Sequence, residues 1–255
     1  MQKIFMVNLL EAAFLGIVQG LTEWLPISSS GHLVIVQQLF GIKASVAFDV
    51  MLHFGTLLSV VYFLRKDIAK LLKFDEESKR TIAYIICASL PVAVIGIAFK
   101  SFFESLFSSL FAVALALILN GFILYSTKFF EGKKKLNFSK AFAIGLAQAF
   151  SIIPGISRSG TTISAGLISR IDKKQAYKFS FLLSIVAILG ATFFEIRELD
   201  LTAEPIESIL LGIAVSALVG FFALKTVARL VLSSNFYKFA YYCWFLGFLI
   251  LLLSF

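Results

Sequence analysis

The sequence predicts an all-α polytopic membrane protein, built as an inverted repeat of six transmembrane helices and two opposed re-entrant helical hairpins. Hydrophobic residues make up 59% of the 255 positions and charged residues only 15%, and the mean hydropathy is +0.93. Soluble domains carry about 25% charged residues, so a lipid bilayer is the expected environment of this chain. Two polar motifs, PISSSGH at residues 26–32 and PGISRSG at residues 154–160, interrupt the apolar sequence.

Six segments are apolar enough to cross a bilayer as helices, which takes roughly 20 residues each, although the fourth is short. One helical hairpin is expected before the first span and another between the third and the fourth. In chain order the elements are the hairpin at residues 8–40, the spans at residues 44–64, 81–99 and 105–127, the hairpin at residues 141–169, and the spans at residues 179–194, 208–224 and 239–255.

Lysine and arginine indicate the orientation of these spans. They gather in three connecting segments, residues 65–80, 128–140 and 170–178, which the positive-inside tendency places in the cytoplasm. Residues 197–207 carry one arginine against four carboxylates and are expected outside, together with both termini. The net charge of +8 forms no basic stripe with interleaved aromatics on a polar domain, so nucleic acid is not an expected partner.

Residues 141–169 join two cytoplasmic segments but are too few to cross twice, because two spans would need about 40 residues plus a turn. They are predicted to enter the membrane, turn and leave on the same side. Residues 8–40 are predicted to do the same from the opposite face. Irregular backbone at that depth is tolerated only where protein or a water-filled cavity surrounds it, so both turns are expected to line a site.

The two halves of the chain, about residues 1–127 and 128–255 of a single domain spanning 1–255, are predicted to be copies inserted in opposite senses. Inverted repeats of this kind place interrupted helices at the midplane, where helix N-termini are available to anions. A shift of 129 residues superposes Gly16 on Gly145, Gln19 on Gln148, Ile27 on Ile156, Ser28 on Ser157, Ser30 on Ser159 and Gly31 on Gly160.

The residues of the two turns suit phosphoryl chemistry. Serine hydroxyls can donate a hydrogen bond or attack, and the planar fork of Arg158 matches phosphate oxygens. Gln19 and Glu23 are four residues apart and so share a helical face that leads into the first turn. Ionisable residues at membrane depth are functional candidates by default.

Each of these features also has a purely structural interpretation. Serine-rich turns with proline and glycine are commonly plain loops, and a lone arginine near a membrane turn commonly snorkels to the interface. His53 and Asp49, four residues apart, are interpreted as a polar pair that stabilises a buried face. Cys87 and Cys243 lack a CxxC pattern and are expected to be small buried hydrophobes. Recurrence at matched positions is what favours a functional interpretation of the two turns.

At these residues the chain resembles a known family, the bacterial undecaprenyl-diphosphate phosphatases, also called bacitracin-resistance proteins. The family's first signature is similar to QGLTEWLPISSSGH, which starts at Gln19, and its second to IIPGISRSGTT, which starts at Ile152. The resemblance extends to DVMLHFGTL and KFSFLLSI, which follow the two hairpins. The chain departs from the Glu-rich version of the first signature at Gln19, which cannot act as a carboxylate base or a hard-metal ligand.

The resemblance implies a membrane enzyme that removes the terminal phosphate of undecaprenyl diphosphate and so recycles the lipid carrier of cell-wall synthesis. It implies a polyprenyl diphosphate lipid as partner and an inner-membrane location with an outward-facing site, and it leaves a homo-oligomer open. Two alternatives use the same turns. One is a transporter or flippase of a phosphorylated polyprenyl lipid, and the other is a non-enzymatic lipid-binding resistance protein.

The resemblance, combined with the chemistry of the residues, implies individual roles. Ser29 is the expected nucleophile, His32 its general acid or base, and Arg158 the group that holds the diphosphate. Glu23 is expected to orient His32 or to bind a divalent cation, with magnesium as the expected ion. Water activated by Glu23 or by the metal is the alternative nucleophile. The rest of the substrate cradle is expected to comprise Gln19, Ser28, Ser30, Gly31, Ser157, Ser159, Gly160 and Thr161.

Overall fold

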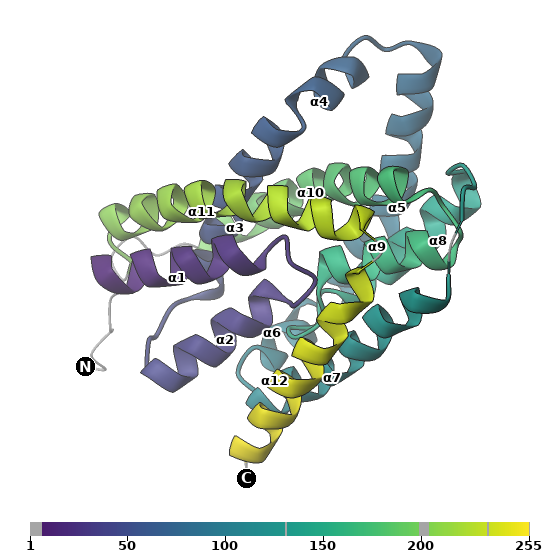
Figure 1. The fold of residues 1–255 in the computed structure, drawn as a ribbon. Helices are drawn as coiled ribbons and strands as arrows, with labels where there is room; N and C mark the ends of the chain where they lie inside the picture. Colours follow the sequence, from purple (N-terminus) through teal and green to yellow (C-terminus); the bar gives the residue numbers. More distant parts are fainter. Residues whose placement is uncertain (1–6, 131, 199–203, 234, 255) are drawn as a thin grey trace.

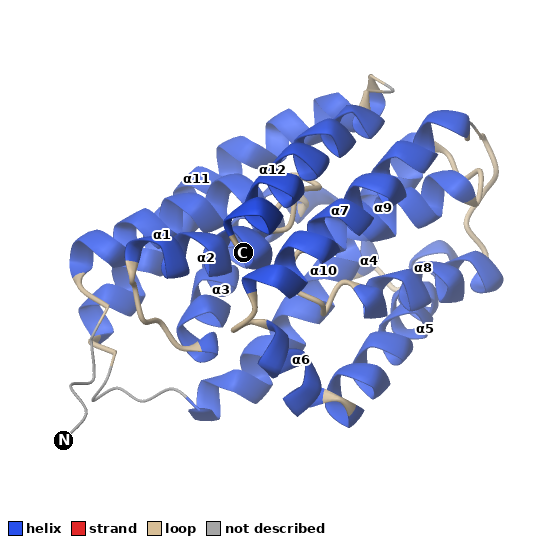
Figure 2. Cartoon of the chain, turned by 90° about the horizontal axis from the view of Figure 1, so that it is seen from below, coloured by secondary structure: helices blue, strands red, loops and turns tan. Residues whose placement is uncertain are grey.

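The computed structural model describes residues 7–130, 132–198, 204–233 and 235–254, which form twelve α-helices and three short 3-10 helices (Figure 1). Figure 2 shows that helices joined by loops make up the part of the chain that the structure describes, with no strand among them. Asp200, one of the carboxylates in the acidic segment, lies outside the described residues.

Six helices are long and apolar enough to cross a membrane, which confirms the six predicted spans. Three of them run beyond the predicted bounds, and the first of these three, the second span, begins at Glu76, where residue 81 was predicted. The fourth span begins at Lys173, because Asp172 caps the helix by accepting from the Gln175 N–H. The fifth span continues through Lys225, whose ammonium lies 4.3 Å from the Phe221 ring centroid. The spans are α3 Val46–Phe63, α5 Glu76–Ala98, α7 Leu110–Ser126, α10 Lys173–Glu195, α11 Ile206–Leu232 and α12 Phe239–Leu253.

Four shorter helices form two helix–turn–helix hairpins. The longest has 14 residues, about 21 Å of helix, which is less than the roughly 30 Å thickness of a hydrocarbon core. In Figure 1 the two hairpins approach from opposite sides and their turns meet near the middle of the molecule. Their insertion from opposite faces of a bilayer stays a prediction. They are α1 Leu9–Thr22 with α2 Ser29–Phe40, and α8 Phe138–Phe150 with α9 Arg158–Ile168.

Two more short helices, which are not among the predicted elements, directly follow spans. They are α4 Arg65–Leu71, after α3, and α6 Lys100–Leu106, after α5.

The second helix of each hairpin begins in the same way. The Ser28 hydroxyl accepts from the Gly31 N–H at 3.2 Å, and the Ser157 hydroxyl accepts from the Gly160 N–H at 3.0 Å. Serine is a favoured N-cap because its short side chain satisfies an N–H that has no partner within the helix. The caps occupy matching positions under the 129-residue shift. The backbone N–H groups of Gly31 and Gly160 are therefore already bound to the capping serines.

Each hairpin is held against a different span by a close helix contact. A Cβ on Gly20 of α1 would lie 2.7 Å from the Val219 Cβ on α11, and a Cβ on Gly145 of α8 would lie 2.4 Å from the Ala88 carbonyl oxygen on α5. Small residues let membrane helices approach this closely, and close contact replaces the hydrophobic drive that lipid does not supply. The two turns are thus positioned by α11 on one side and α5 on the other.

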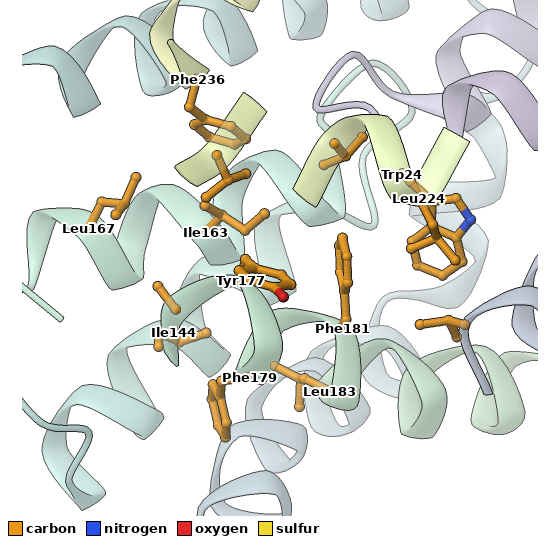
Figure 3. Close-up of a cluster of buried hydrophobic side chains, with 14 of the residues drawn as sticks. Trp24, Ile144, Ile163, Leu167, Tyr177, Phe179, Phe181, Leu183, Leu224 and Phe236 are labelled. Carbon is orange, nitrogen blue, oxygen red and sulfur yellow. The ribbon is translucent and has the colours of Figure 1, made fainter. Parts of the chain in front are cut away.

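An apolar cluster lies beside the first turn. Trp24 is fully buried and packs edge-on against Phe181 of α10, with ring centroids 5.4 Å apart. Tyr177 contacts the same phenyl ring at 5.6 Å, so that Phe181 lies between the two aromatic rings (Figure 3). Large aromatic pairs in edge-to-face geometry add about 0.5–1.5 kcal/mol beyond area burial. This cluster supports the backbone that carries Glu23.

Candidate active site

The two turns are hydrogen-bonded to each other. The Ser28 hydroxyl accepts from the Gly155 N–H at 3.0 Å. Asn120, fully buried on α7, joins the same turns from the side: its Nδ2 donates to the Pro26 carbonyl at 2.9 Å, and its Oδ1 accepts from the Ser157 N–H at 3.1 Å. The two polar motifs therefore lie together in one place, although more than a hundred residues separate them along the chain.

The backbone at this junction adopts conformations that few residues tolerate. Ser28 has φ +68°, in the left-handed region where non-glycine residues are uncommon, and Gly155 has φ +104°. A Cβ on Gly155 would lie 2.6 Å from both the Val113 carbonyl oxygen and the Ala116 Cβ of α7. The second turn is thus pressed against α7, and only glycine fits at this point.

Glu23 lies at the centre of the site, where α1 ends. Its Oε2 accepts from the Ser29 hydroxyl at 2.6 Å and from Gln19 Nε2 at 2.9 Å. Its Oε1 accepts from Arg158 Nη2, and His53 Nε2 lies 3.4 Å from Oε2. The side chain is 5% exposed, and a carboxylate this deeply buried needs such partners to remain ionised.

Arg158 is the first residue of α9 and brings the second hairpin to Glu23. Its guanidinium carbon lies 5.5 Å from the ring centroid of Trp24. The other arm of the fork, Nη1, is buried and has no hydrogen-bond partner within the described part of the chain. One donor of the guanidinium is therefore available to a ligand while Nη2 holds Glu23.

A cavity of about 260 Å³ lies beside these groups. One part of its wall is polar and belongs largely to the two turns, with further polar residues from α3 and α8, and the other part is apolar and belongs largely to α3, α5 and α10. A larger, more open cavity of about 600 Å³ includes none of the motif residues and is lined by lysines and carboxylates in similar number. The polar lining of the smaller cavity comprises Glu23, Ser28, Ser29, Ser30, Asp49, His53, Gln148, Ser151, Ser157 and Arg158, and its apolar lining comprises Val46, Val50, Val92, Phe107, Ile152, Ile156, Ala187, Ile188 and Ala191.

His53 is the histidine that faces this cavity, and within the predicted polar pair it contacts the backbone of Asp49 and not its carboxylate. His53 Nδ1 lies 2.8 Å from the backbone carbonyl oxygen of Asp49, while the Asp49 carboxylate accepts from Gln37 Nε2 at 2.7 Å. Since a carbonyl can only accept, Nδ1 carries a proton, and Nε2, which faces Glu23, is the ring nitrogen that can gain or lose one. The signal that could have found His53 was its ionisable character at membrane depth.

The structure does not bring His32 to Ser29. His32 Nδ1 lies 2.7 Å from the Ser28 carbonyl oxygen, and Nε2 lies 2.7 Å from the Tyr242 hydroxyl of α12. The two rings stack with centroids 5.7 Å apart. His32 thus lies outside the set of cavity-lining residues and connects the strained backbone at Ser28 to the last span.

Comparison with known proteins adds to this geometry. The family model described as "Bacitracin resistance protein BacA" matches residues 12–249. The chain belongs to this family. The match confirms the resemblance that the two motifs indicated.

Curated relatives of this BacA family member carry the name undecaprenyl-diphosphatase. The protein from Methanobrevibacter smithii is 38% identical, over 95% of this chain and 96% of its own length. The protein from Halothermothrix orenii is 40% identical, over 97% of this chain and 98% of its own. Undecaprenyl-diphosphatase 4 of Bacillus thuringiensis is 40% identical over the same shares.

Most of the other predicted cradle hydroxyls of this BacA family member make internal hydrogen bonds. The Ser159 hydroxyl lies 3.1 Å from that of Ser157, and the Thr161 hydroxyl donates to the Ser157 carbonyl at 3.0 Å. Ser30 lines the cavity, and its hydroxyl lies 3.3 Å from that of Ser28. These contacts shape the turns, and a direct part in substrate binding stays a prediction for this group.

Glu23 was also predicted as a ligand for a divalent cation, and its surroundings do not fit that role. Both carboxylate oxygens already accept hydrogen bonds, one of them from a guanidinium. Magnesium prefers oxygen ligands and keeps much of its own water, so it needs carboxylate lone pairs that are available. Among the described residues, no group of three His, Cys, Asp or Glu side chains could hold a metal ion.

Proposed function

We propose that this protein hydrolyses undecaprenyl diphosphate to undecaprenyl phosphate and inorganic phosphate, with Ser29 as the nucleophile and Glu23 as its base. Family membership and the names of the relatives support the reaction. The contact that carries the mechanism is the 2.6 Å hydrogen bond from the Ser29 hydroxyl to Glu23 Oε2. A nucleophile within hydrogen-bond reach of a base, with the base oriented by further groups, is the arrangement that activates a hydroxyl.

In the first half-reaction the Ser29 oxygen attacks the terminal phosphorus, and its proton passes to Glu23 Oε2. The bond from this phosphorus to the bridging oxygen breaks, and undecaprenyl phosphate leaves with the electron pair. His53 Nε2, 3.4 Å from Oε2, is placed to take the proton from Glu23 and release it to the leaving phosphate or to water. Glu23 is thereby ionised again.

In the second half-reaction water attacks the phosphorus bound to Ser29. Glu23 accepts a proton from the water and returns it to the serine oxygen as the bond from phosphorus to that oxygen breaks, so that inorganic phosphate is released and Ser29 regains its hydroxyl. Arg158 offsets charge on the equatorial oxygens in both steps, since its Nη1 already faces no protein acceptor among the described residues.

The apolar part of the cavity wall suits the first isoprenoid units of the lipid. Val92 of α5 and Ile188 of α10 lie on this wall, opposite the polar turns. Diphosphate and prenyl chain would thus contact chemically matched surfaces, and the remaining chain would lie in the bilayer. Nothing in the relatives' names or in the described residues favours a transporter or flippase over this reaction.

We further propose that the site opens to the outer side of the bacterial inner membrane. The cavity is lined by Asp49 near the start of α3, Val92 near the end of α5 and Ala191 near the end of α10. In each of these spans the opposite end adjoins a lysine- and arginine-rich segment, which the positive-inside tendency places in the cytoplasm.

The reaction is tested by measuring phosphate release from a polyprenyl diphosphate labelled at its terminal phosphate, using purified protein in detergent. Rapid quenching should leave label on a peptide that contains Ser29. If Ser29→Ala retains about a tenth or more of parental turnover and no phosphoenzyme appears, water is the nucleophile and the serine mechanism is wrong. Sealed proteoliposomes of known orientation, given a short-chain polyprenyl diphosphate on one side at a time, test the outward opening.

A further inference from the structure

Gln148 presents a buried side-chain amide that the protein itself leaves unsatisfied. It lies in the last turn of α8, is 1% exposed and lines the same cavity as Glu23 and Arg158. Neither Nε2 nor Oε1 has a hydrogen-bond partner anywhere in the described ranges. Burial of an unpaired amide is costly, and buried polar groups in native proteins are nearly always hydrogen-bonded.

Comparison with the first hairpin explains why the partner is missing. Gln19 is the matching residue under the 129-residue shift, and its Nε2 donates to Glu23 at 2.9 Å. The position that matches Glu23 in the second hairpin is occupied by Ile152. An apolar side chain accepts no hydrogen bond, so the carboxamide of Gln148 remains available where that of Gln19 is engaged.

A second unpaired donor lines the same cavity. Arg158 Nη1 is buried and, like the Gln148 amide, lacks a partner among the described residues, whereas Nη2 is bound to Glu23. Two donors on one small cavity, one of them charged, are what a phosphate group with several acceptor oxygens requires. Water alone would satisfy these donors in the free protein, and a ligand must replace that water with acceptors of its own.

We infer that Gln148 is a substrate-contacting residue, whose Nε2 donates to an oxygen of the diphosphate alongside Arg158 Nη1. The inference rests on the proposed phosphatase function and adds to it a residue from the second hairpin. Oε1 is an acceptor, which a fully ionised phosphate cannot satisfy. It is left to accept from water, the other substrate of hydrolysis.

The test compares Gln148→Met with the matched control Gln38→Met, in which the same substitution is made at an exposed position on α2. Methionine keeps the length of the side chain and removes both polar atoms. For Gln148→Met, kcat/KM on a polyprenyl diphosphate is expected to fall about ten- to a hundredfold, the cost of one hydrogen bond to a charged group. The melting temperature should stay level or rise, because an unpaired buried amide has been replaced by an apolar group. Gln38→Met should retain the parental kcat/KM.

Two results would overturn the inference. One is a kcat/KM for Gln148→Met within about twofold of the parent. The other is a melting temperature several degrees lower than the parent, or failure to fold, since the amide would then be required by the structure rather than by the substrate. An inactive parent in the same assay would contradict the phosphatase function itself, which separates the two failures.

Discussion

The Ser29 hydroxyl donates a 2.6 Å hydrogen bond to Glu23 Oε2 across the turn between α1 and α2. Glu23 follows the last residue of α1, and Ser29 is the first residue of α2, so the turn itself sets their separation. Arg158 reaches the opposite oxygen of the same carboxylate from the second hairpin. A nucleophile, its base and a cation for phosphate thus converge on one buried group.

Ser29→Ala and Glu23→Gln are each expected to lower kcat by at least about a thousandfold, because each removes one member of a single acting unit. The double variant should be little slower than either single variant. Turnover measured for all three, with circular dichroism to verify folding, completes the double-mutant cycle. Additive losses would show that the two residues act independently.

The same Glu23→Gln variant tests whether Glu23 acts as a base or as a metal ligand. If Glu23 accepts the proton of Ser29, raising the magnesium concentration should leave the turnover of the variant unchanged, because a metal ion does not replace a proton acceptor. Titration of Mg²⁺ against parent and variant measures this. Recovery of the variant at high Mg²⁺, with the parent already saturated, would assign Glu23 to the metal.

Arg158→Lys is expected to lower kcat/KM roughly ten- to a hundredfold, which corresponds to about 1.5–3 kcal/mol for one strong charged hydrogen bond. A lysine is a point charge on a flexible stem and cannot hold Glu23 and a phosphate oxygen with two arms of one planar group. Arg229→Lys, at an exposed position near the end of α11, is the matched control. Equal activity of the two variants would rule out direct contact between Arg158 and phosphate.

The two histidines should respond differently to removal. His53→Ala is expected to lower kcat about a hundredfold with little change in melting temperature, because His53 faces the cavity and contributes proton transfer. His32→Ala is expected to destabilise the protein by about 1–3 kcal/mol, because it leaves the Ser28 carbonyl and the Tyr242 hydroxyl without their imidazole partner.

Turnover and melting temperature are measured for both histidine variants, and Tyr242→Phe, which deletes only the hydroxyl, should reproduce part of the His32→Ala loss in melting temperature. A His32→Ala variant that melts like the parent yet loses more turnover than His53→Ala would return the acid–base role to His32.

Asn120→Leu is expected to cost about 2–5 kcal/mol, because it leaves the Ser157 N–H buried without a partner and the Pro26 carbonyl with only the weak Cys243 thiol as donor. Asn120→Asp keeps the acceptor and loses the donor, so its melting temperature should lie between those of the parent and Asn120→Leu. If Asn120 positions the two turns, kcat at a temperature where each variant is folded should fall in the same order. Unchanged kcat in folded Asn120→Leu would show that the turns hold their geometry without it.

Much of this architecture could be predicted from the sequence because lipid imposes strict lengths. The six spans follow from apolar runs, and the hairpins follow from segments too short to cross twice. The caps at Ser28 and Ser157 follow from the local pattern of serine before glycine. Glu23, Ser29 and Arg158 could be named because ionisable and nucleophilic residues at membrane depth are rare and so have few alternative explanations.

The tertiary structure decided which side chains face one another. His32 and His53 are equally ionisable in the sequence. In the structure His32 lies against Tyr242 of α12. His53 lies beside Glu23, on a helix, α3, that packs against α10 and α11. The periodicity of the sequence shows which residues share a face of one helix, but it does not show which other helix packs against that face. Asn120 acquires its role in the same way, since the Pro26 carbonyl and the Ser157 N–H that it binds belong to segments far away in the chain. The unpaired amide of Gln148 likewise depends on every segment that surrounds it. Such pairings are set by helix–helix contact, which only the folded arrangement defines.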